Sequence, residues 1–180
     1  MFFRAFLAAP RRIGAIAPSS RGLAQRMARI ATADQPPLVA ELGAGTGVIT
    51  RALLSVLGDD AQLYAFEIHP PFVAHLRRTL RDTRLHLIDA SASTLALLAE
   101  REGLPGFDAI VSALPFSRMP RAATEQIVQA AARSLRPGGV FVALQYHPWY
   151  LLPLLRREFH AVRREVYLWN LPPALILTAR

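Results

Sequence analysis

The chain has 180 residues, which is enough for one domain with a sizeable core but short for two. It has no cysteine, which excludes disulfides and thiolate metal sites, and no apolar run of the roughly 18–20 residues that span a bilayer. All 21 basic residues are arginines, against 13 acidic residues, and the formal net charge of +8 favours an anionic partner, either nucleic acid or an anionic bilayer. We expect a cytoplasmic protein that lies on a membrane, where one is involved, rather than spanning it.

Residues 1–36 form a leader with helical spacing, and Pro36-Pro37 separates it from the domain predicted over residues 37–180. Its first turns place phenylalanines and a leucine beside arginines: Phe2, Phe3, Phe6, Leu7, Arg4, Arg11 and Arg12. Such a helix lies in a membrane interface, or it packs its phenylalanines on its own domain, and the sequence leaves both open. Residues 148–157 repeat the mixture and allow the same two interpretations. Ser19-Ser20 predicts the cap of a helix that begins at Arg21.

After the leader, short apolar runs alternate with helical patterns, which predicts an α/β fold with a parallel sheet. The predicted strands cover residues 38–42, 63–67, 85–88, 109–112 and 140–145. The predicted helices cover residues 48–57, 71–80, 94–101 and 121–135, the last ending at the turn 137–139. Two further runs, 159–168 and 174–179, have no helix between them. They predict a C-terminal antiparallel hairpin, for seven strands in all.

A glycine loop, Glu41-Leu-Gly-Ala-Gly-Thr-Gly47, follows the first strand and opens a helix. Glycines allow a tight turn and a close approach of the backbone to a ligand. An ordinary strand-to-helix turn would account for them as well. Dinucleotide folds use Gly-x-Gly-x-x-Gly with an acid on the next strand, whereas here an acid, Glu41, precedes the first glycine.

Two more acids, Glu67 and Asp89, end the second and third predicted strands. A carboxylate such as Glu67 is able to accept both ribose hydroxyls of an adenosine, and Asp89 is able to receive the adenine amino group. Each acid alone would serve as a helix cap. Because the carboxyl ends of parallel strands converge on one crevice, all three acids together indicate a shared site.

These residues resemble the class I S-adenosylmethionine-dependent methyltransferases, over about residues 38–179. The resemblance implies a Rossmann-like fold preceded by N-terminal amphipathic helices, S-adenosylmethionine as cofactor, S-adenosylhomocysteine as product, and no metal. It assigns the methionyl part to Glu41 and the glycines, the ribose to Glu67, and the adenine to Asp89 with Ala90. The full set implied is Glu41, Gly43, Ala44, Gly45, Gly47, Glu67, Ile68, Asp89, Ala90 and Ser112.

The fourth strand ends in Ser112-Ala-Leu-Pro-Phe116, which resembles the Asn/Asp-(Leu/Pro)-Pro-(Tyr/Phe) motif of amino-nitrogen methyltransferases. In that motif, backbone carbonyl and side-chain acceptors hold the target amine. A proline here would also simply end the strand. Ser112 replaces the usual Asn or Asp and Ala113 is an extra residue, which argues against recognition of a nucleic-acid base.

The leader 3–20, the strand-four motif and Gln145-Tyr-His-Pro148 together resemble the bacterial phospholipid N-methyltransferases of the Rhodobacter type. That family converts phosphatidylethanolamine to phosphatidylcholine in up to three methyl transfers. The resemblance implies a phospholipid substrate, an anionic membrane surface, no nucleic acid, and a monomer at the inner face of the cytoplasmic membrane. It also allows the Gly14–Ser20 stretch to fold over bound cofactor as a lid. The substrate-binding candidates are Leu114, Pro115, Phe116, Arg118, Arg121 and Tyr146.

Tyr146 and His147 are the catalytic candidates, because the acceptor ammonium must lose a proton before its lone pair attacks. Tyr146 would hydrogen-bond the amine or the phosphate, and His147, with an ordinary pKa near 6.5, would take the proton. A core Tyr, a surface His and water as the base remain open. Arg118 and Arg121 would clamp the lipid phosphate, or they are solvated arginines at a helix start.

Two other functions compete with lipid methylation. A nucleic-acid adenine methyltransferase, of which the ribosomal RNA adenine dimethylases are examples, would explain the charge and the strand-four motif but not Phe2-Phe3 and Phe6. A non-enzymatic membrane-binding module would leave the three acids and the glycine loop without a role.

Overall fold

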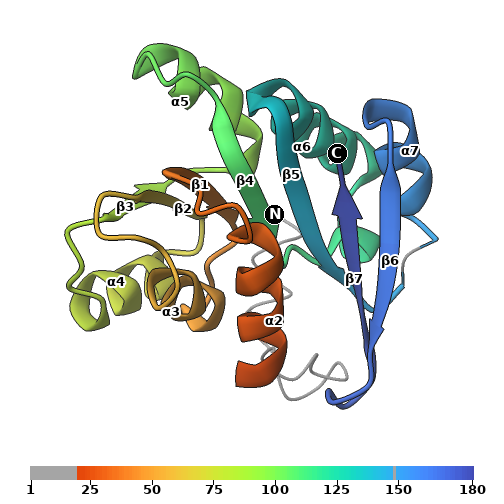
Figure 1. Cartoon of the computed structure of the whole chain (residues 1–180), viewed down its shortest axis with the longest axis horizontal. Coiled ribbons are helices and arrows are strands. Elements are labelled where there is room, and N and C mark those ends of the chain that lie inside the picture. The colour runs from red at the N-terminus through yellow and green to blue at the C-terminus, as the bar shows by residue number, and fades with distance from the viewer. Residues whose placement is uncertain (1–19, 148) are drawn as a thin grey trace.

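Seven strands form one sheet in the order β3-β2-β1-β4-β5-β7-β6 in the computed structural model, which describes residues 20–147 and 149–180 (Figure 1). The strands are β1 (Leu38–Leu42), β2 (Gln62–Glu67), β3 (Leu85–Asp89), β4 (Phe107–Ser112), β5 (Leu135–Gln145), β6 (Val162–Tyr167) and β7 (Ala174–Ala179). The helices are α2 (Arg21–Ala31), α3 (Val48–Leu54), α4 (Pro70–Thr79), α5 (Leu95–Arg101), α6 (Arg121–Ser134) and α7 (Leu152–Glu158), with 3-10 turns η1 (Ala92–Thr94) and η2 (Phe116–Arg118). β1 to β5 pair in parallel, and β7 pairs antiparallel with β5 and β6, which confirms the predicted class I methyltransferase fold.

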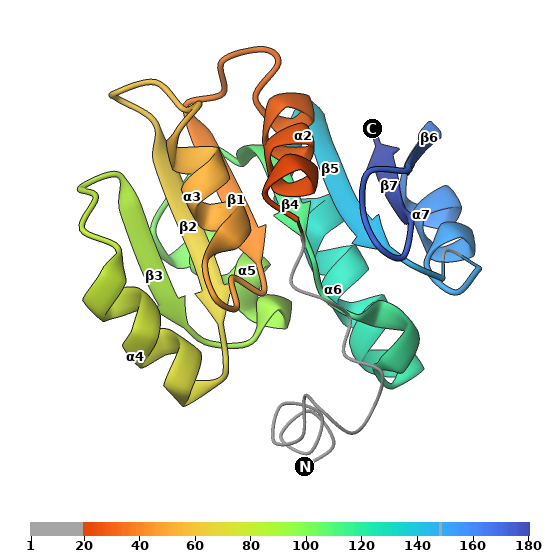
Figure 2. The same cartoon turned by 90° about the horizontal axis from the view of Figure 1, so that it is seen from below.

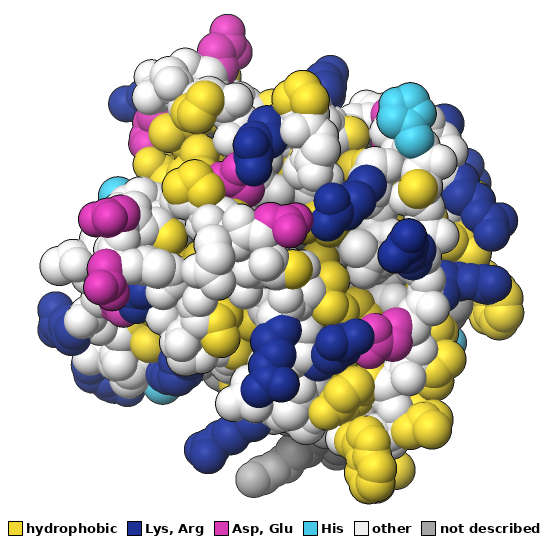
Figure 3. Space-filling model, viewed as in Figure 1, with side chains coloured by type: hydrophobic (Ala, Val, Ile, Leu, Met, Phe, Trp, Pro, Cys, Tyr) yellow, Lys and Arg dark blue, Asp and Glu magenta, His cyan; other side chains and the backbone are white. Residues whose placement is uncertain are grey.

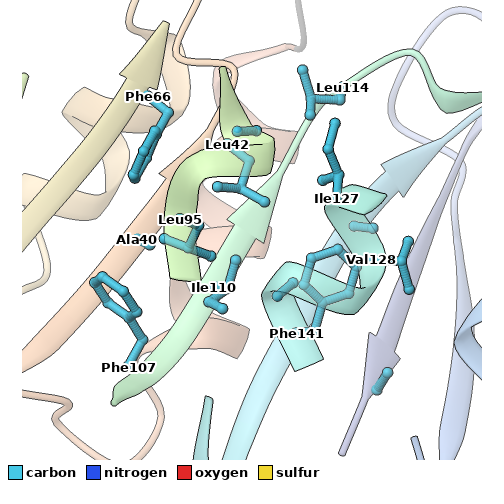
Figure 4. Close-up of a cluster of buried hydrophobic side chains, with 14 of the residues drawn as sticks. Ala40, Leu42, Phe66, Leu95, Phe107, Ile110, Leu114, Ile127, Val128 and Phe141 are labelled. Carbon is cyan, nitrogen blue, oxygen red and sulfur yellow. The ribbon is translucent and has the colours of Figure 1, made fainter. Parts of the chain in front are cut away.

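Helices cover both faces of the sheet (Figure 2). On one face α5, α6 and α7 pack around Ile110 and Phe141, and on the other α2 and α3 pack around Val142. Figure 4 shows the first of these clusters, where Leu95 and Ile127 of the helices lie over the strand residues. Strands β1 and β4 are buried along their whole length, which is why they read as unbroken apolar runs in the sequence.

β5 begins earlier than the sequence predicts. It starts at Leu135, so that the Pro-Gly-Gly segment expected as a turn lies inside the strand and α6 ends at Ser134. The ladder between β4 and β5 shifts register between Phe107 and Ala109. The buried Asp108 lies at this shift, where it forms an ion pair with an arginine of the early part of β5. The irregular pairing explains why no regular strand pattern is visible in this segment of the sequence.

The segment before β6 holds a helix that the predicted hairpin did not include. Residues 152–157 of the run 148–157 lie in α7, which buries Leu154 and Leu155 against the α6 face of the sheet. For this part of the run the structure supports the covered helix, whereas Trp149 before it is exposed. β6 is correspondingly shorter than the predicted strand 159–168.

The described part of the predicted leader packs on the sheet. Ser20 caps α2 as predicted, because its hydroxyl accepts a hydrogen bond from the Leu23 N–H at 3.2 Å. Arg26 of α2 donates two hydrogen bonds to Glu165 of β6, at 2.8 and 2.7 Å. Residues 1–19, which contain the whole predicted membrane face and most of the predicted lid, lie outside the described residues. Within the described ranges, no helix combines the length and apolarity needed to cross a membrane.

Candidate active site

The ends of the parallel strands bring the predicted cofactor residues to one edge of the sheet, which we call the carboxyl edge. Leu42 pairs with Phe66 on one side and with Ser112 on the other, and Glu67 pairs with Asp89. The acids near the ends of β1, β2 and β3 therefore lie on adjacent strands. The chain order reverses between β1 and β4, and ligands of open α/β sheets bind beside such a point.

The glycine loop 43–47 is held on two sides. The N–H groups of Gly43 and Ala44 donate to the Phe66 carbonyl, at 2.9 and 3.0 Å. Gly43 has a φ of +83°, and a Cβ at this position would lie 2.6 Å from the Leu114 side chain. The loop therefore fits between the end of β2 and the segment after β4 only with glycine at position 43.

Glu67 is buried and fixed by backbone donors. Its Oε2 accepts a hydrogen bond from the Gly45 N–H at 2.7 Å, and its Oε1 accepts from the N–H groups of Ile68 and His69 at 2.9 and 2.8 Å. A carboxylate offers about four lone-pair positions, so three backbone bonds leave room for a ligand donor. The glycine loop and the end of β2 are thus joined through one carboxylate, at the position expected to bind ribose.

Glu41 is a buried acid without a hydrogen-bond partner. It is 1% exposed, and neither carboxyl oxygen has a partner in the described structure. Burial raises the pKa of Glu41 to about 7; nearby Thr50 partly opposes this, and the charge of Glu67 adds to it. The Thr50 hydroxyl is also buried and unpartnered. A cationic ligand group near these oxygens would favour ionised Glu41, so the pair fits the ammonium-bearing methionyl part of S-adenosylmethionine.

Asp89 and Ile68 are more accessible than the other cofactor candidates. The Asp89 side chain is half exposed, and the nearest cation, Arg77, lies 3.8 Å from it. Ile68 is 51% exposed, at the end of the neighbouring strand. An apolar surface beside an accessible carboxylate suits a planar base that carries an amino group, as predicted for adenine.

The strand-four motif is folded back on itself. The buried Ser112 hydroxyl accepts a hydrogen bond from the Leu114 N–H at 3.3 Å. The Leu114 carbonyl accepts from the Phe116 N–H at 2.9 Å and from the Gln145 side-chain amide at 3.0 Å. Phe116 is fully buried in the core, and the two hydrogen bonds occupy both lone pairs of the Leu114 carbonyl. Substrate contacts by Leu114, Pro115 and Phe116 stay predictions.

Tyr146 lies just past β5 and is held by a residue that the sequence analysis missed. Its hydroxyl accepts a hydrogen bond from the Asn170 side-chain amide at 3.1 Å, so its own proton is left to donate. Asn170 also accepts from the Ser20 N–H at 3.2 Å and donates to the Pro172 carbonyl at 2.8 Å. In the sequence, Asn170 stands out only as a single amide in an otherwise apolar turn. Gln145 stands out in the same way, as a polar residue at the end of an apolar strand.

The remaining polar candidates lie on the surface. Arg118 and Arg121 are exposed near the start of α6, where the Arg121 guanidinium donates to Glu125 at 3.0 Å. His147 is exposed directly after Tyr146. Their roles in phosphate binding and proton transfer stay predictions.

Comparison with known sequences matches residues 39–139 to a family described as a methyltransferase domain. The chain belongs to this methyltransferase family. The match contains the glycine loop, all three predicted acids and the strand-four motif. This methyltransferase uses S-adenosylmethionine as its cofactor.

Individual proteins resemble the methyltransferase over most of its length. An ornithine lipid N-methyltransferase from Singulisphaera acidiphila is 29% identical, over 90% of this chain and 85% of its own. The structure of the N-methyltransferase NodS from Bradyrhizobium japonicum has a TM-score of 0.69 at 15% identity, over 91% of this chain and 97% of that one. A 16S rRNA methyltransferase from T. thermophilus, in complex with AdoMet and guanosine, has a TM-score of 0.68 at 24% identity, over 94% and 44%. The two structures show the shared fold.

The raised pKa of Glu41 predicts a pH-dependent stability. The folded, cofactor-free protein binds a proton that the unfolded chain releases, so the stabilisation is fully present below about pH 4.5 and is lost as the pH rises through about 7. Over this range we expect the free energy of unfolding of the wild type to fall by about 3 kcal/mol more than that of Glu41→Gln, whose amide does not titrate. Denaturant unfolding at several pH values measures the difference, and identical pH profiles would contradict it.

Proposed function

We propose that this methyltransferase transfers methyl groups from S-adenosylmethionine to the amino nitrogen of a membrane lipid, namely phosphatidylethanolamine and its methylated forms, towards phosphatidylcholine. The observation that carries the proposal is the similarity to an ornithine lipid N-methyltransferase over 90% of the chain. The leader and the strand-four motif resemble phospholipid N-methyltransferases and favour phosphatidylethanolamine among aminolipids. We expect a monomer that acts at the inner face of the cytoplasmic membrane.

The chain's own residues would position the two reactants. S-adenosylmethionine supplies a methyl group on a positively charged sulfonium. Glu67, fixed by three backbone N–H groups, would orient the ribose, and Glu41 would attract the positive methionyl part. Holding the acceptor nitrogen in line with the carbon–sulfur bond supplies much of the acceleration in such a displacement.

Tyr146 is the group best placed to receive the acceptor. Because its oxygen accepts a hydrogen bond from Asn170, its O–H points elsewhere and is free to donate to a phosphate oxygen of the head group. The same oxygen has a remaining lone pair that would accept from the amine. The proton released from nitrogen would pass to water or to His147, which is exposed and follows Tyr146 directly in the chain.

The direct test offers the wild type labelled S-adenosylmethionine with three acceptors: phosphatidylethanolamine, ornithine lipid and ribosomal RNA. We expect label in the organic phase, co-migrating with monomethylated phosphatidylethanolamine. Label on ornithine lipid alone would support lipid N-methylation but would show that the acceptor is ornithine lipid rather than phosphatidylethanolamine. Label on RNA with none on lipid would overturn the proposal in favour of a nucleic-acid methyltransferase.

Tyr146→Phe should lower turnover on phosphatidylethanolamine by about tenfold or more, because it removes the hydroxyl that would contact the head group. Affinity for S-adenosylmethionine, measured by calorimetry, should be unchanged. Tyr150→Phe is the matched control, since Tyr150 packs against the core beyond the end of β5, and it should keep wild-type turnover. Normal turnover in Tyr146→Phe would exclude a role for its hydroxyl.

A further inference from the structure

The connection between β6 and β7 lies at the carboxyl edge, beside the crevice. β6 ends where Tyr167 pairs with Ala174, and on the other side of β7 Leu175 pairs with Gln145, the last residue of β5. Because β6 runs parallel to β5, residues 168–173 leave the sheet at the same edge as the predicted cofactor and acceptor sites. We call residues 168–171 the hairpin tip.

The hairpin tip exposes large apolar side chains. Leu168 is 71% exposed, and Trp169 and Leu171 are each 87% exposed. Trp149, which follows the end of β5, is 76% exposed. Figure 3 shows hydrophobic side chains gathered around the lower end of the hairpin rather than scattered. Large exposed apolar side chains gathered in this way mark an interaction surface.

The tip is held in place from within by Asn170. Asn170 is 8% exposed, and its side chain bonds the Tyr146 hydroxyl, the Ser20 N–H and the Pro172 carbonyl. The residues on either side of it, Trp169 and Leu171, therefore face solvent from an anchored loop. Large apolar side chains exposed on an anchored loop are suited to contact a partner outside the domain.

The charges around the tip favour an anionic lipid surface over a protein. Arg163 and Arg164 are exposed on β6, in the half of the strand away from the tip, and from Val166 to the last residue the sequence holds no acid. The single acid of β6, Glu165, is neutralised by Arg26 of α2. Tryptophan, leucine and arginine together are the residues of a membrane interface, where aromatic rings sit at head-group level and arginines meet lipid phosphates.

The start of the described chain lies against the hairpin tip. Ser20 is the first described residue of the chain. Its backbone N–H donates a hydrogen bond to the side chain of Asn170 in the hairpin tip. The described chain therefore begins next to the tip.

We propose that the hairpin tip, with Trp149, inserts into the interface of an anionic bilayer and turns the crevice towards the lipid head groups. This rests on the proposed lipid methylation. Through Asn170, the element that touches the bilayer also holds Tyr146, which would act on the head group. Docking depends on the exposed Trp169 and Leu171, whereas the buried Asn170 between them holds Tyr146.

Vesicles of phosphatidylethanolamine and phosphatidylglycerol test the proposal by sedimentation. The double variant Trp169→Ser with Leu171→Ser should bind them at least about tenfold more weakly than the wild type, because two side chains no longer leave water. Leu97→Ser is the matched control, since Leu97 is 65% exposed on α5, away from the hairpin, and it should bind normally. Equal binding of the double variant and the wild type would overturn the proposal.

Tryptophan fluorescence locates the contact directly. The chain has two tryptophans, so Trp149→Phe leaves Trp169 as the only reporter. Its emission should shift to the blue on binding vesicles and should be quenched by lipids with brominated chains. Absence of both effects would overturn the proposal. A red shift of Trp169 on deleting residues 2–9, with no vesicles present, would assign the tip to the leader instead.

Activity in detergent separates this proposal from the proposed function. On phosphatidylethanolamine dispersed in detergent micelles, the double variant should keep wild-type turnover while losing it on vesicles. Loss of turnover in both would contradict a docking role. A wild type that methylates no lipid in either form would refute the proposed function, whereas the fluorescence result would still decide whether Trp169 meets a bilayer.

Discussion

The Glu67 carboxylate binds three backbone N–H groups, one from the glycine loop and two from the start of the β2–α4 connection, and so ties together the ends of two parallel strands. Beside it, Glu41 is buried with no partner for either oxygen, and burial raises its pKa to about 7. Two nearby buried carboxylates cost the free protein electrostatic energy, which a cationic ligand relieves. In the proposed cofactor site, the same acids would attract a sulfonium compound more strongly than the neutral thioether that remains after methyl transfer. The arrangement would thus favour binding of the cofactor and release of the product.

The sheet was predictable because its buried strands appear in the sequence as short apolar runs. β1 and β7 have the predicted bounds, and β2, β3 and β4 extend them by one or two residues. The predicted elements differ from the structure where tertiary contacts, rather than a regular pattern of apolar residues, determine the local structure. β5 starts at Leu135 because of a register shift at Asp108, which no periodicity shows. The run 148–157 fits a membrane boundary as well as a covered helix, and only its burial against α6 distinguishes them.

The cofactor half of the site was more predictable than the acceptor half. Glu41, Glu67 and Asp89 lie at or next to the ends of neighbouring parallel strands, so topology alone brings them together. The acceptor half depends on contacts between distant segments. Asn170, which holds Tyr146 from the far hairpin, carries no motif, and the Leu114 carbonyl is occupied by the Gln145 amide from another strand. The lipid-facing role of the hairpin tip likewise follows from exposure, which the sequence does not contain.

The central claim is that the buried carboxylates at the ends of β1 and β2 form the cofactor site, and calorimetric titration with S-adenosylmethionine tests it most directly. Glu67→Ala should weaken binding more than tenfold, whereas Glu67→Gln, which keeps an acceptor oxygen for the backbone, should lose less. Glu100→Ala, an exposed position on α5, should bind as the wild type does. Wild-type affinity in a folded Glu67→Ala protein would contradict the assignment.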